Sequence, residues 1–339
     1  MNIQQAITRL IDGRDLTQEE ARRVMDRIMS GECTDAQIGA YLTALRMKGE
    51  TVEEIAGSAL TMREKSLKVK ADGVVVDTCG TGGDGLGTFN ISTTVAFVVA
   101  ASGVNVAKHG NRSISSKSGS ADVLKALGVN IDADLAVVER CIAEAQIGFI
   151  FAPKHHGAMR HVMAARKELA MRTIFNLLGP MTNPAGAPFQ LIGVYDGALT
   201  APMAQVLGRL GSKHALVVHG SDGLDEITTT GPTRVAELDR SGNVTSYVIE
   251  PEQFGLPRAS LDDLKGGDAD ENAQITQSIL SGGLGPRRDI VTLNAGAALC
   301  VSGITADINS GLKLACELID SGKALARLDH LIRLSNETA

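Results

Sequence analysis

The chain has 339 residues, a formal net charge of −6 at pH 7 and 44% hydrophobic residues, a composition typical of a soluble globular protein. The acidic balance and the low aromatic content of 3% argue against a nucleic-acid-binding protein, which needs basic surface and stacking side chains. The cysteines are scattered without a closely spaced pair, and no apolar run reaches the length of a signal sequence or a membrane span. We therefore expect a cytoplasmic protein that binds neither nucleic acid nor membrane.

The first 70 residues predict a helical domain. Apolar residues recur there at helical spacing, and glycines stand where helices should end. Each expected helix opens on a capping box, a threonine followed three residues later by Glu or Gln: Thr17 with Glu20, Thr34 with Gln37, and Thr51 with Glu54. The apolar faces of these helices suit either a monomer core or contact with a second subunit.

Residues 71–339 predict an α/β domain, because strand and helix patterns alternate. Strands are expected at Val74–Val76, Val104–Ala107, Gly148–Phe151, Leu191–Tyr195 and Ala215–His219. Helices are expected between them, at Thr93–Ala101, Ala121–Leu127, Leu135–Ala145, His156–Glu168 and Ala201–Leu210. Such alternation is typical of a central, mainly parallel sheet flanked by helices.

The last third of the chain departs from this alternation. Short antiparallel strands are expected at Glu226–Thr229, Thr233–Leu238 and Val244–Ile249. A helical tail follows from about Asp270, interrupted by a loop of glycines and a proline at 282–286.

Five glycines follow the first strand of the α/β domain, in the segment VVVDTCGTGGDGLGTFN. Glycine reaches positive φ and carries no Cβ, so such a loop lets backbone N–H groups bind a phosphate. Gly80, Gly82 and Gly85 also match the dinucleotide pattern GxGxxG, but the acidic residue which that pattern needs about 20 residues later is missing. A flexible turn explains the glycines but not the two aspartates that frame them, Asp77 and Asp84. We favour a phosphate-binding loop.

A second polar loop, KHGNRSISSKSGSAD, follows the next strand and runs from Lys108 to Asp122. Its cations and hydroxyls suit a phosphate ester or pyrophosphate, and a solvated Ser/Gly loop is the common alternative. Because the two loops follow neighbouring strands, their ligands should meet at one edge of the sheet. The pair predicts one ligand with two phosphate groups joined by something the size of a sugar.

Adjacent carboxylates, Asp225 and Glu226, stand in the turn HGSDGLDEITTTG. They suit Mg²⁺, which needs only one or two carboxylates when it also binds a pyrophosphate. Ser92, in FNIST, could add a hydroxyl ligand. A turn aspartate beside a solvated glutamate is an equally ordinary interpretation when such a pair stands alone, but here it accompanies two predicted phosphate loops.

Arg166 precedes an expected apolar turn at Asn176–Pro184. One guanidinium facing an apolar pocket would suit an aromatic carboxylate, whereas spacing alone favours a surface arginine on a helix. His155, His156 and His161 do not form a zinc motif, and we expect them at a helix start and on the surface.

Together these motifs resemble the anthranilate phosphoribosyltransferase family of tryptophan biosynthesis, in the nucleoside-phosphorylase-like class of phosphoribosyltransferases. The resemblance covers essentially the whole chain and rests on five segments: DTCGTGGDG (77–85), FNIST (89–93), KHGNRSISSKSGSAD (108–122), RKELAMRTIFNLLGPMTNP (166–184) and the acidic pair. It implies a small N-terminal helical domain completed by a helical segment near 165–185, and a larger α/β domain, 71–339, that binds phosphoribosyl diphosphate. It also implies a homodimer through the N-terminal helices. One departure is Ala170, where the family usually has glycine.

The resemblance further implies transfer of a phosphoribosyl group from 5-phosphoribosyl 1-diphosphate to the amine of anthranilate, with Mg²⁺ as cofactor. The residues it implies for the phosphoribosyl diphosphate are Gly80, Gly83, Asp84, Thr88, Asn90, Ile91, Ser92, Thr93, Lys108, His109, Gly110, Asn111, Arg112, Ser113, Ile114, Ser115, Ser116 and Ser120. Those implied for anthranilate are Gly80, Asn111 and Arg166, and those for the metal are Ser92, Asp225 and Glu226. Lys108, Asn111 and Arg166 are expected to carry the catalysis.

Two alternatives stay open from the sequence. A phosphoribosyltransferase for another aromatic acceptor would be favoured by loss of Asn111 or Arg166, and both are present. A non-catalytic phosphate-binding homologue would be favoured by an incomplete set of motifs, and the set is complete.

Overall fold

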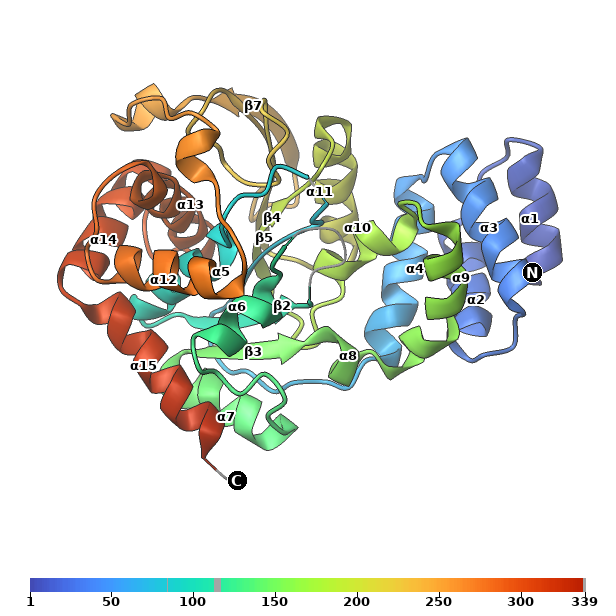
Figure 1. Cartoon of the computed structure of the whole chain (residues 1–339). Helices are drawn as coiled ribbons and strands as arrows, with labels where there is room; N and C mark the ends of the chain where they lie inside the picture. Colours follow the sequence, from blue (N-terminus) through green and yellow to red (C-terminus); the bar gives the residue numbers. More distant parts are fainter. Residues whose placement is uncertain (84, 113–116, 338–339) are drawn as a thin grey trace.

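The computed structural model describes residues 1–83, 85–112 and 117–337, in which a helical part stands beside a larger part built on a sheet (Figure 1). The helical part begins with α1 (Ile3–Ile11), α2 (Gln18–Met29), α3 (Asp35–Lys48) and α4 (Val52–Lys65). The three predicted capping boxes are confirmed, because the side chains of Thr17, Thr34 and Thr51 each accept a hydrogen bond from the backbone N–H three residues later. Each box satisfies N–H groups that a helix start leaves without partners.

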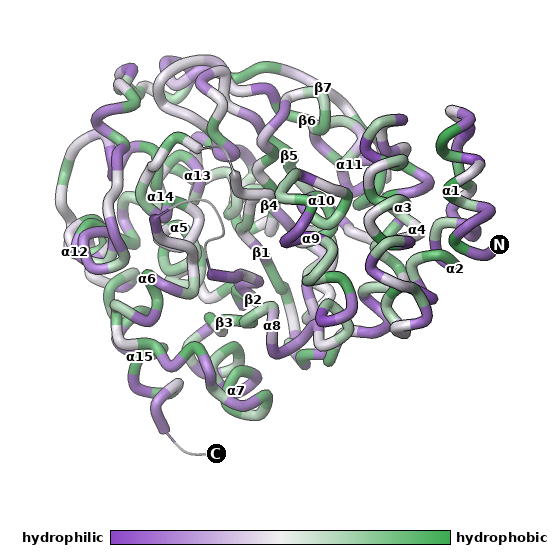
Figure 2. The backbone as a smooth tube through the Cα atoms, turned by 45° about the vertical axis from the view of Figure 1, so that its right-hand side comes forward, coloured by the Kyte–Doolittle hydropathy of each residue, from purple (hydrophilic) through white to green (hydrophobic). Residues whose placement is uncertain are grey.

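Two later helices lie against this bundle. The helix α9 (Met163–Leu169) packs on α3, and α10 (Ile174–Met181) packs on α3 and α4, as the green and blue ribbons of Figure 1 show. Apolar side chains from both sets, such as Leu42 and Phe175, belong to one buried cluster. In Figure 2, α1–α4 alternate between hydrophobic and hydrophilic stretches, as expected of helices that bury one side. We propose that the segment near residues 165–185 completes the domain of residues 1–70.

The larger part is organised around a seven-stranded sheet with the order β3-β2-β1-β4-β5-β6-β7. Its strands are β1 (Val75–Gly80), β2 (Asn105–Gly110), β3 (Ile147–Phe151), β4 (Phe189–Gly193), β5 (His214–Gly220), β6 (Thr233–Leu238) and β7 (Val244–Ile249). The strands β1 to β5 are parallel, β6 pairs antiparallel with β5, and β7 pairs antiparallel with β6. The predicted fold class, an N-terminal helical part and an α/β part with a mainly parallel sheet, is confirmed.

The direction in which the chain crosses the sheet reverses at β1. From β1 it continues to β2 and β3 on one side, and it then returns to β4 on the other side of β1. In open parallel sheets, ligands bind at the carboxyl ends of the strands at such a point. The last residues of the two strands, Gly80 and Gly193, pair in register there, and the predicted phosphate loop follows Gly80 directly.

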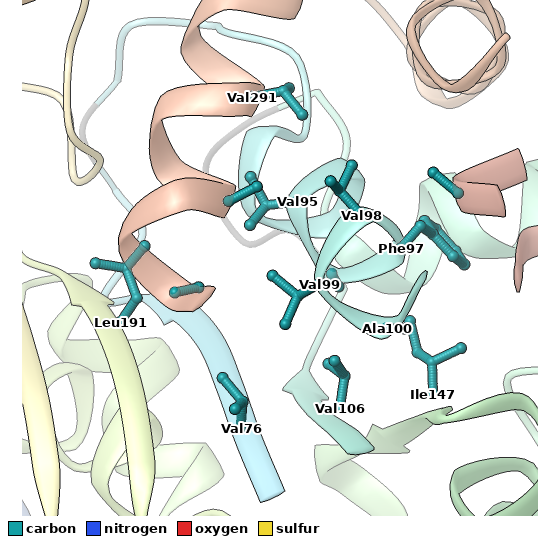
Figure 3. Packing of buried hydrophobic residues seen from close by; sticks show 14 of the residues in the cluster. Val76, Val95, Phe97, Val98, Val99, Ala100, Val106, Ile147, Leu191 and Val291 are labelled. Atoms are coloured by element: carbon teal, nitrogen blue, oxygen red, sulfur yellow. The ribbon is translucent and has the colours of Figure 1, made fainter. Parts of the chain in front are cut away.

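The central helix of the core is α5 (Ile91–Ala101). Every residue of α5 except Ser92 is buried. Figure 3 shows its valines and Phe97 between Val76 and Val106 of the sheet and Val291 of α13 (Pro286–Ser302). A helix that is apolar on all sides belongs in such a place. The core therefore fixes the N-terminus of α5 at the carboxyl ends of the strands. Ser92, the one partly exposed residue of α5, lies there.

The remaining helices surround the sheet. They are α6 (Ser120–Ala126), α7 (Leu135–Ala145), α8 (Ala152–His155), α11 (Thr200–Arg209), α12 (Ala269–Leu280), α14 (Ile308–Asp320) and α15 (Lys323–Asn336). The expected glycine-rich loop separates α12 from α13. Within the described ranges, none of the helices combines the length and the apolar character needed to cross a membrane.

The strand expected at Glu226–Thr229 is wrong, because this segment forms a loop. The N–H of Ile227 donates to Asn294 Oδ1 at 2.9 Å, and the N–H of Thr228 donates to Thr233 Oγ1 at 3.0 Å. Side chains thus satisfy backbone groups that a strand would pair with a neighbouring strand.

Two other expectations also need correction. The single helix expected at His156–Glu168 is divided: the backbone of His156 (φ −113°, ψ 56°) is not helical, Gly157–His161 form a 3-10 turn, and α9 begins only at Met163. The apolar turn expected at Asn176–Pro184 is mostly helix, because α10 runs through Pro180. A proline removes one hydrogen bond from the helix that contains it, and α10 ends one residue later, at Met181.

Ala170 ends α9 in the left-handed region, with φ 46° and ψ 32°, which costs a residue with a Cβ about 1–2 kcal/mol. We predict that Ala170→Gly raises the free energy of unfolding by about 0.5–1 kcal/mol, once the greater freedom of glycine in the unfolded chain is subtracted. The midpoint of urea denaturation measures the change. The control is Ala164→Gly in the same helix, which should lower stability. Destabilisation by Ala170→Gly would contradict the prediction.

Candidate active site

The predicted phosphate loop leaves the end of β1 beside the end of β4. The N–H of Thr81 donates to the carbonyl of Gly193 at 2.9 Å and so joins the loop to β4. Four glycines of the loop have positive φ, between 65° and 76°, a conformation that favours glycine: Gly82, Gly83, Gly85 and Gly87. Asp84, which the sequence placed in this site, lies outside the described residues.

The acidic pair lies against the same two strand ends. A Cβ on Gly193 would lie 1.5 Å from the carbonyl oxygen of Asp225, and a Cβ on Gly80 would lie 2.2 Å from Asp225 Oδ2. Only glycine permits this approach at either strand end. The carboxylate of Asp225 accepts a hydrogen bond from the N–H of Gly82 at 2.8 Å. Glu226 Oε1 accepts one from the N–H of Ser92 at 3.1 Å, at the start of α5.

The three residues predicted to hold a metal therefore come together between the glycine loop and the N-terminus of α5. Two carboxylates and a hydroxyl form a set of hard oxygen donors, which suits Mg²⁺, since that ion usually takes one or two carboxylates and completes its shell with water and phosphate. In the part of the chain that the structure describes, no three His, Cys, Asp or Glu side chains group as ligands. This site would therefore need oxygens from the phosphates of a ligand.

Lys108 lies beneath the site rather than at its surface. Its side chain is 2% exposed, and Nζ donates to the carbonyl of Thr78 at 2.7 Å and lies 3.5 Å from Ser92 Oγ. Burial lowers the pKa of Lys108, and the nearby charge of Asp77 opposes that effect. Asp77 is fully buried, and burial raises its pKa to about 6 against the opposing charge of Lys108. Asp77 was expected to frame the phosphate loop, but it lies buried beneath that loop, near Lys108.

The second predicted loop begins at the end of β2, and its residues differ in exposure. His109 is buried, whereas Asn111 and Arg112 are exposed. Asn111 Oδ1 accepts a hydrogen bond from the N–H of Arg112, whose guanidinium lies 5.9 Å from the ring centre of Phe151. Ser113, Ile114, Ser115 and Ser116 lie outside the described residues.

The remaining predicted donor-site residues lie around the start of α5 and the start of α6. Asn90 precedes α5, and its Nδ2 donates to the carbonyl of Ser118 at 3.2 Å, which joins the two loops. The side chains of Ile91 and Thr93 are buried, so only their backbones can face a ligand. Thr88, Gly110 and Ser120 are the other predicted residues here, and a Cβ on Gly110 would contact Ser120.

Arg166 is a partly buried cation on α9. Its guanidinium lies 5.3 Å from the ring centre of Phe175, and burial lowers the pKa of Arg166. Among the described residues, it makes no hydrogen bond or ion pair with any acid. A cation that an aromatic ring holds in place can bind an anion. The alternative interpretation, a solvated arginine on the surface, would not hold the guanidinium in one position.

Arg172, Asn272 and Asn294 also support the site, and the sequence motifs did not single them out. Arg172 donates to the carbonyl of Gly83 and stacks 4.0 Å from the ring centre of Tyr195, so the segment before α10 contacts the glycine loop. Asn272 on α12 donates to Asn90 Oδ1 at 3.0 Å, and Asn294 on α13 holds Ile227. The two asparagines are buried in helices. Asn294 interrupts an apolar helical run, which was a signal in the sequence, whereas Asn272 stands among polar residues and gave none.

The expectation of surface histidines is wrong for His155 and His156, which are buried. The rings of His156 and His109 lie 5.1 Å apart between their centres. Burial lowers the pKa of His109 to about 3 and that of His156 to about 4. Both rings are therefore neutral at pH 7.

Comparison with known proteins places the whole chain in a single family. The glycosyl transferase family, helical bundle domain, matches residues 4–66, and the glycosyl transferase family, a/b domain, matches residues 72–325. Anthranilate phosphoribosyltransferase of Geotalea uraniireducens is 53% identical, over 99% of this chain and 100% of that protein. The enzyme of the same name from Syntrophobacter fumaroxidans is 55% identical, over 99% of each chain.

Solved structures give the same result. The crystal structure of anthranilate phosphoribosyltransferase from Thermus thermophilus superposes with a TM-score of 0.93 and 44% identity, over 98% of this chain and 99% of that chain. The enzyme from Saccharomyces cerevisiae in complex with PRPP and Mg superposes with a TM-score of 0.88 and 29% identity, over 98% of this chain and 97% of that chain. The resemblance stated from the sequence motifs is confirmed.

The buried histidines predict a loss of stability in acid. In the unfolded chain His156 becomes protonated below the ordinary histidine pKa of 6.5. In the folded protein its ring stays neutral until about pH 4. The contribution of the buried neutral ring to the free energy of unfolding is therefore present above pH 6.5 and is lost as the pH falls below that value. We expect His156→Gln to reduce the loss of unfolding free energy between pH 7 and 5 by about 1–2 kcal/mol. Urea denaturation at both pH values measures it, with His330→Gln on α15 as the control. An unchanged pH dependence in His156→Gln would contradict the prediction.

Proposed function

The chain belongs to the anthranilate phosphoribosyltransferase family, and we propose that it transfers the phosphoribosyl group of 5-phosphoribosyl 1-diphosphate to the amine of anthranilate. The products are N-(5-phosphoribosyl)anthranilate and pyrophosphate, in tryptophan biosynthesis. One observation carries the proposal for this chain: the glycine loop, Lys108 of β2 and the acidic pair lie together at the carboxyl ends of β1, β2 and β4. A diphosphate ester of a sugar needs these three kinds of group together.

We propose that the two loops hold the donor. The backbone N–H groups around Gly83 and those at the N-terminus of α5 suit phosphate oxygens, because they supply donors and the positive end of a helix dipole. Asn90 and the second polar loop, which follows β2, would close around the ribose phosphate, and the exposed cation of Arg112 would add charge there.

Mg²⁺ is the cofactor that we propose, and Ser92, Asp225 and Glu226 are the residues that would hold it. Their oxygens fit the ion, and the relative from Saccharomyces cerevisiae was solved in complex with PRPP and Mg. When bound, the ion supplies positive charge to the oxygens of the leaving diphosphate. Lys108, buried next to Ser92, supplies a second positive charge from below.

For the acceptor, we propose that Arg166 binds the carboxylate of anthranilate and that Asn111 and the backbone at Gly80 border the ring. Support comes from the guanidinium of Arg166, which lies over Phe175 and meets no acid in the described residues. A related enzyme from Saccharomyces cerevisiae was solved in complex with 4-fluoroanthranilate, at 28% identity.

The reaction then depends on charge stabilisation and positioning. The bond between the anomeric carbon and the diphosphate oxygen breaks, and a bond from the anthranilate nitrogen to that carbon forms. Lys108 and the loop N–H groups stabilise the negative charge that grows on the departing pyrophosphate. The aromatic amine is neutral at pH 7, so alignment of its nitrogen with the anomeric carbon is the second task of the protein. The amine releases its proton after the new bond forms.

We also propose that the protein works in the cytoplasm as a homodimer through its N-terminal helices. Support comes from two apolar side chains that those helices leave exposed, Ile11 at 71% and Met47 at 83%. Contact with a second subunit would cover both side chains.

Release of pyrophosphate tests the reaction. We expect the full chain with phosphoribosyl diphosphate and Mg²⁺ to release pyrophosphate only when anthranilate is present, and to lose that activity when EDTA removes the metal. Coupled detection of pyrophosphate measures it. Absence of release, with the donor still raising the melting temperature, would reject anthranilate and favour another aromatic acceptor. Absence of both effects would reject the donor site as well.

Removal of the Arg166 guanidinium tests the acceptor site. We predict that Arg166→Ala raises the KM for anthranilate about 10–100-fold, since a charged hydrogen bond contributes about 1.5–3 kcal/mol. The KM for phosphoribosyl diphosphate should change little. Steady-state kinetics measures both constants, and Lys167→Ala, the exposed neighbour on α9, is the control. A normal KM for anthranilate in Arg166→Ala would refute the carboxylate contact.

A further inference from the structure

Asn294 is a polar residue in the middle of the apolar helix α13, and its side chain is fully buried. Its amide binds the backbone of Ile227 in both directions: the N–H of Ile227 donates to Oδ1 at 2.9 Å, and Nδ2 donates to the carbonyl of Ile227 at 2.8 Å. Nδ2 also donates to the carbonyl of Ile290 at 2.8 Å. The amide thus uses its acceptor and both of its donor hydrogens, as a buried polar group should.

Ile227 directly follows Asp225 and Glu226, and we call the segment from Asp222 to Thr230 the acidic loop. The amide of Asn294 therefore fixes the acidic loop on one side of the two carboxylates. The other side is fixed by Gly80 and Gly193, which approach Asp225 more closely than any side chain would allow. Asp222 stabilises the same loop through one carboxylate oxygen, which accepts hydrogen bonds of 2.6 Å from the hydroxyls of both Thr228 and Thr230.

Two neighbouring carboxylates that share one small region repel each other when no cation lies between them. A loop that could move would relieve that repulsion by turning one carboxylate towards water. The cation would then have to restore the geometry when it binds, which weakens its binding. Rigid support from outside the ligand shell avoids this loss, and removal of such support typically costs about 10–100-fold in metal affinity or activity.

We propose that Asn294 is a positioning residue that holds Asp225 and Glu226 in the arrangement a divalent cation requires. The proposal rests on the proposed function, because it takes the cation to be the one that accompanies phosphoribosyl diphosphate. Asn294 does not touch the ligand in this arrangement. It acts through the backbone of Ile227, and through it the helix α13, far along the chain from the acidic pair, supports the site.

The test compares Asn294→Ala with a matched control, Thr61→Val. Thr61 is also fully buried in a helix, and its hydroxyl donates to the carbonyl of Arg22 on another helix, in the helical part of the protein. Both changes remove a buried hydrogen bond to a backbone carbonyl and should lower the melting temperature. Calorimetric titration of phosphoribosyl diphosphate at a series of Mg²⁺ concentrations, without anthranilate, gives the Mg²⁺ concentration that supports half of the donor binding.

We expect that concentration to rise about tenfold or more in Asn294→Ala and to stay at the wild-type value in Thr61→Val. An unchanged Mg²⁺ requirement in Asn294→Ala, or an equal rise in Thr61→Val, would overturn the proposal. Failure of the wild-type chain to bind the donor at any Mg²⁺ concentration would reject the proposed function.

Hydrogen exchange of the ligand-free protein decides the positioning role separately, including the case in which Asn294→Ala folds too weakly for titration. We expect the amide of Ile227 in the wild-type chain to exchange as slowly as the amides of α13, because a buried carboxamide accepts its hydrogen bond. Fast exchange of that amide in the wild-type protein would show a mobile acidic loop and would overturn the proposal.

Discussion

The geometry of the site depends on a close approach between the acidic loop and two strand ends that carry no side chains. The carbonyl and carboxylate of Asp225 lie where a Cβ on Gly193 and on Gly80 would stand. Because these two residues pair in register at the point where the sheet reverses its order, the acidic loop enters the one place where parallel strands direct their ligands. The glycine loop then contacts Asp225 through Gly82, and α5 contacts Glu226.

Charge is arranged in layers around this approach. The carboxylates of Asp225 and Glu226 accept hydrogen bonds from backbone N–H groups, and below them Lys108 is buried beside Ser92. Asp77 lies near enough to keep the buried lysine from being an isolated charge, which would be costly in a core. The neighbouring ring of His109 is neutral, so of these two buried side chains Lys108 is the one that can place positive charge beneath the site.

The sequence predicted most of the fold and of the site because both depend on local patterns. Capping boxes, helical periodicity and glycines after a buried strand act within a few residues, and the structure keeps them. The errors arose where distant residues decide. The loop at Glu226–Thr229 has strand-like residues, yet Asn294 and Thr233 satisfy its backbone. The sequence favours a surface position for His155 and His156, because no pattern nearby in the chain indicates that they are buried. Asn272 supports the loops from another element, and no motif includes it. Arg172 stands within the motif at 166–184, but only the fold shows that it contacts the glycine loop.

The contact between the acidic loop and α13 also sets the order in which parts of the site can fold during synthesis. The glycine loop, the second polar loop and the acidic pair all precede residue 227, yet the amide that fixes the acidic loop comes from Asn294. A ribosome therefore presents every motif of the site before it presents the residue that fixes the carboxylates. Since domains generally fold as units during translation, the nascent chain can close its helical part once α9 and α10 have followed α1–α4, well before α13 is made. The acidic loop can take its final geometry only after α13 has left the exit tunnel.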